Sequence, residues 1–311
     1  MNQDRDSEAA AYHRPVLVEE VVELMAPVIP GVVVDATFGG GGHTRRMLDE
    51  FGDEVTVIAI DRDPDALANL GELNATLIEA NFADIDEAVT SVTDQPISGV
   101  LFDFGVSSHQ LDEAGRGFSY RREGPLDMRM GPDANLDANV VVNEWSVEDI
   151  ARIIREHGEE PMARRIARAI VAARPIDSTA TLSTVIADAM PAARRRAGHP
   201  ARRTFQAIRI AVNEELVAVA DGVSKAVDLV RTGGRVVAIS YHSLEDRIVK
   251  REFVRRAKGC TCPPDLPVCG CGNTAEVRIL TRKPIRAGAE EIETNNRARS
   301  ATLRAVEKVA S

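Results

Sequence analysis

Residues 35–43 combine an aspartate, four consecutive glycines and a histidine, residue types that suit the binding of a small charged ligand. Gly39 to Gly42 can adopt positive φ angles and let the backbone approach a ligand with no Cβ in the way. The β-branched run Val32–Val34 comes before this turn and predicts a short buried strand. Asp61 ends a second apolar run, about 20 residues on, where nucleotide-binding βαβ units place an acid for ribose hydroxyls. The pattern therefore predicts a nucleotide-like ligand.

The glycine spacing distinguishes two classes of such ligand. A dinucleotide fingerprint, Gly-x-Gly-x-x-Gly, needs a third glycine where this chain has Thr44. Asp35, Gly39 and Gly41 instead form acid-x-x-x-Gly-x-Gly, which resembles the first motif of Rossmann-like methyltransferases that bind S-adenosylmethionine. That ligand carries an ammonium and a sulfonium, so an acidic rim suits it better than a phosphate cradle. A glycine-rich connection without a ligand is disfavoured, because four glycines cost conformational entropy with no gain in packing.

Strand-like and helix-like runs alternate through the first hundred residues. Such alternation predicts right-handed βαβ units and a parallel sheet, whose ligands bind outside the carboxyl ends of the strands. Asp35, Asp61, Phe82 and Asp103 fall at or just after predicted strand ends, so we expect them at one edge of the sheet. The expected strands are 32–34, 55–60, 76–80, 99–102 and 234–240, and the expected helices are 64–73, 85–92 and 245–258.

The strand pattern stops at about residue 124 and resumes at 234. We therefore expect a helical domain inserted into an α/β domain. The last segments, 277–282 and 301–309, predict a terminal antiparallel pair. Within the insertion the expected helices are 147–157, 162–173, 182–193 and 205–219.

Charge is distributed unevenly along the chain, whose net charge is −10. Residues 1–100 carry 20 Asp and Glu against 5 Arg, whereas residues 151–210 carry 12 Arg against 5 acidic residues. The arginine-rich stretch is typical of a nucleic-acid-binding segment and equally of a solvated helical surface. No apolar run approaches the roughly 18 residues that span a membrane, and the acidic N-terminus does not resemble a signal peptide. A cytoplasmic location is the default expectation.

The four cysteines lie together as Cys260-Thr-Cys262 and Cys269-Gly-Cys271. In a cytosolic protein, clustered cysteines favour metal binding over disulfides. However, Cys-x-Cys pairs differ from the usual zinc-knuckle spacing. A structural tetrathiolate zinc site and unligated thiols both remain open, and we assign no catalytic role to the cluster.

Longer sequence motifs carry a resemblance to a known family. They are 116–120 (RGFSY), 124–130 (GPLDMRM), 203–209 (RTFQAIR) with 213–216 (NEEL), and 241–250 (YHSLEDRIVK). These motifs resemble the bacterial 16S ribosomal RNA cytosine-N4 methyltransferase family, also called MraW or RsmH. The match runs from 13–17 to 295–300, nearly the whole chain. Departures are small: Arg202 stands where a threonine is expected and Phe104 where leucine is commoner.

The resemblance implies methylation of the N4 amine of a cytidine in the decoding region of 16S ribosomal RNA, with S-adenosylmethionine as cofactor. It implies an α/β fold in which a Rossmann-like class I methyltransferase domain, residues 1–122 and 217–311, carries an inserted all-helical domain, residues 123–216, that recognises RNA. The implied partner is 16S ribosomal RNA or the small ribosomal subunit, with no membrane. The oligomeric state stays open, with a homodimer as one candidate. The implied cofactor contacts are Gly41, Gly42, His43, Asp61, Phe82, Asp103 and Gln110.

Methyl transfer to an exocyclic amine needs help because the N4 lone pair of cytosine is delocalised into the ring. A hydrogen-bond acceptor for an amine proton can turn the lone pair toward the methyl group and take up developing charge. Asp103 is the candidate, although amine methyltransferases usually show Asp/Asn-Pro-Pro-Tyr/Phe where this chain shows DFGVSS at 103–108. A second acceptor stays unassigned. Asp103 has a plainer reading as a cofactor contact or helix cap.

His242 and Ser243 follow the predicted strand at 234–240 and are expected to face the same cleft, as base contacts or as a cap of the next helix. Tyr241, Phe118 and Tyr120 are candidates to stack on the cytosine or to lie in the core. The candidates for phosphate contacts are the arginines at 164, 165, 194–196, 202 and 203.

Two other classes compete with this interpretation. A nicotinamide-dependent dehydrogenase is disfavoured by the acidic first motif and by Thr44 in place of the third glycine. A non-catalytic RNA-binding assembly factor with a vestigial nucleotide fold is disfavoured by the intact glycine turn, Asp61 and Asp103.

Overall fold

A computed structural model describes residues 15–310 except 69–70, 72, 108–109, 111, 193–198, 261 and 263–269. His13, Arg194, Arg195, Arg196 and Cys269 from the sequence predictions lie outside the described residues.

The chain forms two compact units, Met1–Gly105 with Leu216–Ser311, and Val106–Glu215. The sequence placed the first border at 122/123, later than the structure does at 105/106. The difference arises because Val106, Phe118 and Tyr120 pack in the core of the second unit, although they precede its helices.

The first unit is built on a seven-stranded sheet in the order β3-β2-β1-β4-β5-β7-β6. Strands β1 to β5 are parallel, and β7 pairs antiparallel with both β5 and β6. The predicted parallel sheet and the predicted terminal antiparallel pair are both confirmed. The strand bounds are β1 Gly31–Asp35, β2 Val55–Asp61, β3 Ala75–Glu79, β4 Ile97–Asp103, β5 Val230–Ser240, β6 Val277–Ile279 and β7 Thr302–Lys308.

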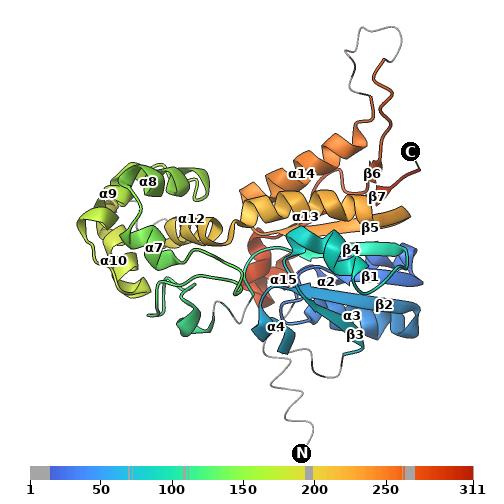
Figure 1. Ribbon diagram of the computed structural model, residues 1–311, viewed down its shortest axis with the longest axis horizontal. Helices are drawn as coiled ribbons and strands as arrows, with labels where there is room; N and C mark the ends of the chain where they lie inside the picture. The colour runs from blue at the N-terminus through green and yellow to red at the C-terminus, as the bar shows by residue number, and fades with distance from the viewer. Residues whose placement is uncertain are drawn as a thin grey trace, which may run out of the picture. The chain divides into compact units, whose positions relative to one another are not determined.

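Helices cover both faces of the sheet, which explains why its strands are apolar throughout (Figure 1). In β4, Val100 and Phe102 belong to the hydrophobic cluster on one face, and Leu101 belongs to the cluster on the other. The first face is covered by α5 (Ile85–Thr90), α13 (Glu215–Leu229) and α14 (Ser243–Ala257), and the second by α2 (Val18–Met25), α3 (Gly42–Phe51) and α15 (Ala289–Thr294). Shorter elements are η1 Ala26–Val28, η2 Gly52–Glu54, α4 Pro64–Ala68, η3 Phe82–Asp84 and η5 Asn296–Ser300.

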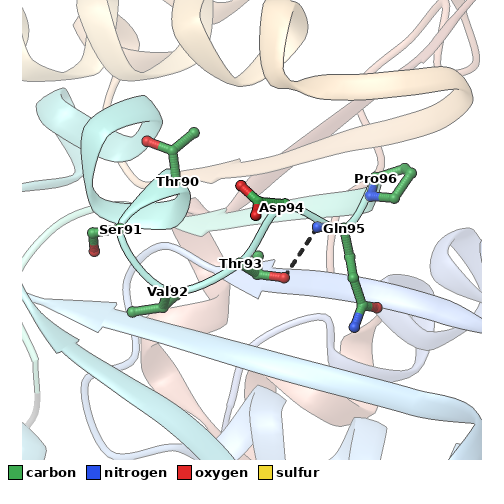
Figure 2. Close-up of a pocket in the computed structure, with 7 residues that line it drawn as sticks. All are labelled: Thr90, Ser91, Val92, Thr93, Asp94, Gln95 and Pro96. Atoms are coloured by element: carbon green, nitrogen blue, oxygen red, sulfur yellow. Dashed lines mark hydrogen bonds between the residues drawn. The ribbon is translucent and has the colours of Figure 1, made fainter.

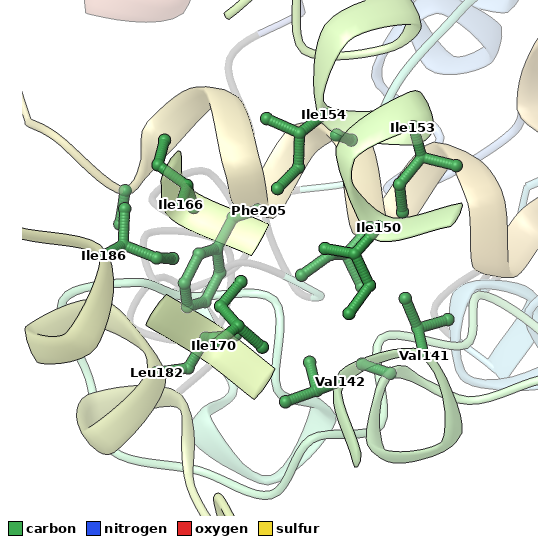
Figure 3. Packing of buried hydrophobic residues seen from close by; sticks show 14 of the residues in the cluster. Val141, Val142, Ile150, Ile153, Ile154, Ile166, Ile170, Leu182, Ile186 and Phe205 are labelled. Atoms are coloured by element: carbon green, nitrogen blue, oxygen red, sulfur yellow. The ribbon is translucent and has the colours of Figure 1, made fainter. Parts of the chain in front are cut away.

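The second unit is helical, and its described residues contain no strand. Isoleucine, valine and leucine side chains from its helices meet around Phe205 in one core (Figure 3). Burying each such side chain stabilises the fold by roughly 1.5–3 kcal/mol. Asn213 fastens the 124–130 motif to this core, because its side chain accepts from Met130 N at 2.8 Å and donates to Met128 O at 2.8 Å. The elements are η4 Ala114–Arg116, α7 Ala138–Asn143, α8 Val147–Glu156, α9 Ala163–Ala172, α10 Thr179–Ala189 and α12 Arg202–Asn213.

Two predicted helices of the insertion have different bounds in the structure. The single helix expected at 205–219 is wrong: α12 ends at Asn213, and α13 begins at Glu215 after Glu214 adopts a φ of 51°. A paired hydrogen bond from Arg209 to Glu215, 2.8 Å at both oxygens, holds this break. Helix α10 starts earlier than expected because the Ser178 side chain caps it, and it ends before Pro191.

None of the described helices is both long and apolar enough to cross a membrane.

Candidate active site

The glycine turn connects β1 to α3 at the carboxyl edge of the sheet. Gly39 and Gly41 have φ angles of 53° and 69°, in the left-handed region that favours glycine. A Cβ on Gly41 would lie 2.6 Å from the ring of Phe38, so the ring or the turn would have to shift to admit it. Gly39 N donates to Asp61 Oδ2 at 2.7 Å and thereby ties the turn to the end of β2. The turn is thus a shaped backbone surface next to a carboxylate.

Asp35 ends β1 at the predicted edge of the sheet, but its side chain is buried. It is 1% exposed, and its carboxylate accepts from Thr44 Oγ1 at 2.7 Å and from Thr37 N at 3.3 Å. Burial raises the pKa of Asp35, partly offset by His43 and these hydrogen bonds. The expectation that Asp35 belongs to an acidic rim is therefore wrong. Its carboxylate faces the protein and stabilises the glycine turn. Thr44, which stands where a dinucleotide fingerprint has its third glycine, donates a hydrogen bond to it.

Asp61 is the carboxylate that remains at the rim. Its Oδ1 accepts from Asp63 N at 2.9 Å and its Oδ2 from Gly39 N. Burial raises the pKa of Asp61 to about 6, opposed by these two backbone hydrogen bonds and assisted by the charges of Asp63 and Asp35. The negative potential from several carboxylates at one edge favours a positively charged ligand.

Asp103, the last residue of β4, lies in a cluster of polar groups from three other segments. Tyr241 Oη donates to Asp103 Oδ1 at 2.7 Å, and Thr37 Oγ1 accepts from Asp103 N at 2.6 Å. Burial, and then the charge of Asp103, raise the pKa of Tyr241 well above its ordinary value, so the phenol stays protonated and donates. Tyr241 therefore orients the carboxylate, a role that its sequence position after a strand did not reveal.

His43 completes this cluster from the first turn of α3. It is 6% exposed, and its Nε2 lies 3.0 Å from Val16 O. Since a carbonyl only accepts, Nε2 carries the proton. Its other ring nitrogen, Nδ1, lies 3.7 Å from Asp103 Oδ2, too far for a direct hydrogen bond. The imidazole thus faces Oδ2 of Asp103, the carboxylate oxygen that does not accept from Tyr241.

His242 and Ser243 are placed by the start of α14. His242 is its N-cap: Nδ1 accepts from Glu245 N at 3.4 Å, and Glu245 Oε2 accepts from the backbone N of His242 and of Tyr241. His242 Nε2 lies 3.0 Å from Glu245 Oε1. Ser243 is exposed as the first residue of the helix. The capping role foreseen as the alternative for His242 is therefore present, and base contact by His242 or Ser243 stays a prediction.

Two predicted cofactor contacts belong to different units. Phe82 follows β3, and its ring lies 5.8 Å from that of Phe102 and 5.6 Å from that of Phe104. Gly222 of α13 lies against it, since a Cβ there would come within 2.8 Å of Phe82. Gln110 belongs to the second unit, where its Oε1 accepts from Ser107 N at 3.1 Å.

Two of the three stacking candidates have other partners inside the second unit. Phe118 is 5% exposed in the helical core, which is the second of the two alternatives given for it. The ring of Tyr120 lies 4.3 Å from that of His199 and 5.9 Å from that of Phe205. The chain has few aromatic residues, and such large apolar side chains are mostly buried in the hydrophobic core.

The sequence did not predict the roles of three residues at the site. Thr37 and Thr44 both lie in the glycine-turn segment, and Thr44 entered only as a missing glycine. Tyr241 entered only as an aromatic ring. A hydroxyl within a ligand turn and a tyrosine directly after a strand were the available signals, but neither names its partner.

A separate hollow lies on the surface between α5 and β4, lined by residues 90–96 (Figure 2). It precedes β4 and therefore lies at the amino edge of the sheet, opposite Asp103. Asp94 is its one ionisable residue. The hollow contains none of the predicted site residues.

The edge at β1, β2 and β4 suits a cofactor with a ribose and positive charge. It is the point where the strand order reverses, because β1 pairs with β2 on one side and β4 on the other. The glycine turn offers backbone without side chains, and Asp61 offers a carboxylate for hydroxyl groups. These residues fit S-adenosylmethionine, which supplies a methyl group on a positively charged sulfur.

Known proteins resemble nearly the whole chain. A relative from Symbiobacterium thermophilum named "Ribosomal RNA small subunit methyltransferase H" is 50% identical over 310 residues, 96% of this chain and 98% of its own length. A relative of the same name from Heliobacterium modesticaldum is 48% identical over 309 residues, covering 96% and 99%. The model of the MraW methylase family matches residues 10–309. This methyltransferase assignment confirms the predicted class I fold and S-adenosylmethionine as the cofactor. With its sheet, its glycine turn and this match over nearly its full length, the chain belongs to the MraW methylase family.

Proposed function

We propose that this enzyme transfers a methyl group from S-adenosylmethionine to the N4 amine of a cytidine in the decoding region of 16S ribosomal RNA. The observation that carries the proposal is the Asp103 carboxylate at the carboxyl end of β4, oriented by Tyr241 and close to the glycine turn. The names of the relatives support the small-subunit RNA as substrate.

The role of Asp103 follows from the weakness of the amine as a nucleophile. One carboxylate oxygen, Oδ1, is occupied by the Tyr241 hydroxyl, and the other, Oδ2, faces His43. In our proposal Oδ2 accepts a hydrogen bond from the N4 amine, which localises the lone pair and stabilises the charge that develops on nitrogen. Thr37 fixes the backbone of Asp103, so the acceptor is held in place before the base arrives.

The direct test is methyl transfer to small ribosomal subunits from cells that lack the enzyme. Labelled S-adenosylmethionine and nucleoside mass spectrometry would identify the product, with free 16S RNA compared in parallel. We expect N4-methylcytidine as the labelled nucleoside. Label in another nucleoside, or no transfer to either substrate, would contradict the proposal.

Cofactor binding should depend on pH through Asp61. Its pKa of about 6 means that the carboxylate is ionised above this pH and protonated below it. Because the ionised form is the better acceptor for ribose hydroxyls, we expect the dissociation constant for S-adenosylmethionine to rise about 4-fold from pH 7.5 to pH 5.5. Calorimetric titration across this range measures it.

Two variants make the pH test specific. Asp61→Asn should bind more weakly with little dependence on pH, whereas the exposed Asp53→Asn should keep the dependence of the parent chain. If the Asp61→Asn variant retains the full pH dependence, another group is responsible for it.

The arginines of the helical unit are proposed to contact RNA phosphates. In α9 the residues Ala163, Ile166 and Ile170 are buried, which leaves Arg164 and Arg165 exposed. Arg202 is exposed at the start of α12. Arg203 differs from these three, because its guanidinium donates to Glu159 O at 2.9 Å and lies 3.5 Å from the buried Glu160.

Replacing Arg164, Arg165 and Arg202 together by alanine should weaken RNA binding and flatten its dependence on salt. Each phosphate contact to single-stranded RNA contributes about 0.7 to the slope of log affinity against log salt, so we expect the slope to fall by about 2. Filter binding at several salt concentrations measures it. Arg278→Ala, which removes an exposed charge paired with Glu307 in the other unit, is the comparison for a general charge effect. An unchanged slope in the triple variant would exclude these contacts.

A further inference from the structure

Three described cysteines between α14 and β6 form a cluster that has no part in the methyl transfer proposed above. The sulfur atoms of Cys260, Cys262 and Cys271 all lie within 4.8 Å of one another. The first two follow α14, and the third precedes β6 from the other side of the connecting loop. The fold therefore brings together thiols that the sequence separates by a proline-rich segment.

We infer that Cys260, Cys262 and Cys271 bind a zinc ion that closes this loop. Zinc–thiolate bonds are about 2.3 Å long, so sulfurs around a tetrahedral zinc lie about 3.8 Å apart. Cys271 Sγ and Cys260 Sγ are 3.7 Å apart, close to this value and well beyond the roughly 2.05 Å of a disulfide. The separation thus matches two ligands of one metal.

The surroundings of the sulfurs support a thiolate site. Gly270 N donates to Cys262 Sγ at 3.4 Å, and backbone hydrogen bonds of this kind stabilise negative charge on metal-bound sulfur. Each thiol releases its proton when it binds the ion. The sequence has a fourth cysteine, Cys269, which lies outside the described part of the chain.

The base of the loop is already joined, which makes closure by a metal effective. Glu276 N donates to Arg256 O at 2.9 Å, and the side chains of the two residues form an ion pair. Just beyond them, a Cβ on Gly259 would lie 2.9 Å from Ala275 N, so the two sides of the loop run against each other. Above this base, none of the described loop residues belongs to a hydrophobic cluster. A metal ion that binds thiols from both described sides of the loop would hold these two sides together.

The zinc ion would have a structural role, because its site lies far from the methyl-transfer site. Helix α14 starts next to Asp103 and runs back, so it ends at the amino edge. Strand β6 begins at this same edge, since Val277 pairs with Lys308 beyond the Arg235–Glu307 pair of β5 and β7. The ion would therefore lie at the edge opposite the methyl-transfer site.

The test uses the full chain purified under reducing conditions without chelator. Metal analysis should find about one zinc per chain, and cobalt substitution should give the intense thiolate charge-transfer absorption of sulfur-bound cobalt. Cys260→Ser and Cys271→Ser should each lose most of the zinc, whereas Thr274→Ala, an exposed residue of the same loop, should retain it.

Two further readouts distinguish a metal site from a disulfide and from free thiols. Removal of zinc should speed tryptic cleavage after Lys258, while affinity for S-adenosylmethionine changes less than about 2-fold because the two sites lie at opposite edges. Thiol titration of the denatured chain should find all four cysteines reduced. The inference is overturned if neither zinc nor cobalt binds to the reduced chain, if both serine variants keep the metal, or if a pair of thiols is missing as a disulfide.

Discussion

Replacing Asp103 by alanine should lower the turnover number about 10²- to 10³-fold, measured at saturating S-adenosylmethionine and saturating RNA substrate. Loss of one preorganised group that stabilises developing charge has effects of this size. Asp103 is already oriented by the Tyr241 hydroxyl and by Thr37, so its acceptor oxygen needs no rearrangement when the base binds. Single-turnover measurement of labelled methyl transfer isolates the chemical step, and equilibrium binding reports RNA affinity separately.

Two conservative variants test whether the effect comes from the carboxylate itself. Asp103→Asn keeps an acceptor oxygen but removes the charge, so its turnover number should lie between those of the parent enzyme and the alanine variant. Tyr241→Phe removes the hydrogen bond that orients Asp103 and leaves the carboxylate in place, with an expected loss of about 10-fold. If Asp103→Ala reduces RNA affinity as much as turnover, the residue holds the complex together and does not assist the reaction.

The second large effect is expected from Gly41→Ala, which should weaken binding of S-adenosylmethionine by at least about 30-fold. The left-handed conformation costs a residue with a Cβ about 1–2 kcal/mol, and the new methyl group would lie 2.6 Å from the Phe38 ring. Either the turn or the ring must move, and both form the surface that the cofactor would contact. Isothermal calorimetry measures the affinity, and thermal unfolding with and without cofactor measures stability.

Gly52→Ala is the matched control for backbone strain. Gly52 ends α3 at a φ of 53°, and an added Cβ there would meet nothing within 4 Å. This variant should lower stability while cofactor affinity changes less than about 2-fold, because no cradle atom is displaced. Equal losses of affinity in both glycine variants would show that the effect acts through stability, and that Gly41 does not shape the site.

The sequence predicted the elements of the sheet well because their signals are local. The apolar runs that end at Asp35, Asp61 and Asp103 are buried on both faces, and their composition shows it without knowledge of their neighbours. The strand-end rule then placed these aspartates at one edge, where the structure has them. Parallel pairing followed from the alternation with helices.

The break at Glu214 shows where local signals fail. The apolar period continues from Phe205 to Val219, so the sequence predicts one helix. The structure instead stops α12 at Asn213, whose side chain is taken by the backbone of Met128 and Met130. Those partners lie more than eighty positions away in the sequence, and no local rule includes them.

Site roles divide in the same way. The glycine turn and the acid after the second strand predicted S-adenosylmethionine as the methyl donor, because the backbone shape and the charge at that turn are local properties. Whether a carboxylate faces the ligand or the protein was not local: Asp35 is buried under Thr44, whereas Asp61 stays at the rim. Both residues end strands, and the sequence treats them alike.

By itself, the sequence determined the fold class, the cofactor and the family, because repeated local patterns and long motifs carry that information. Only the tertiary structure decided that Tyr241 orients Asp103, that His242 caps α14, that Phe118 fills a core, and that the described thiols converge. The contact between Tyr241 and Asp103 depends on which strands are neighbours, and the thiol cluster depends on where a loop returns. That order is set by packing of the whole chain, so residues 138 positions apart can share one hydrogen bond.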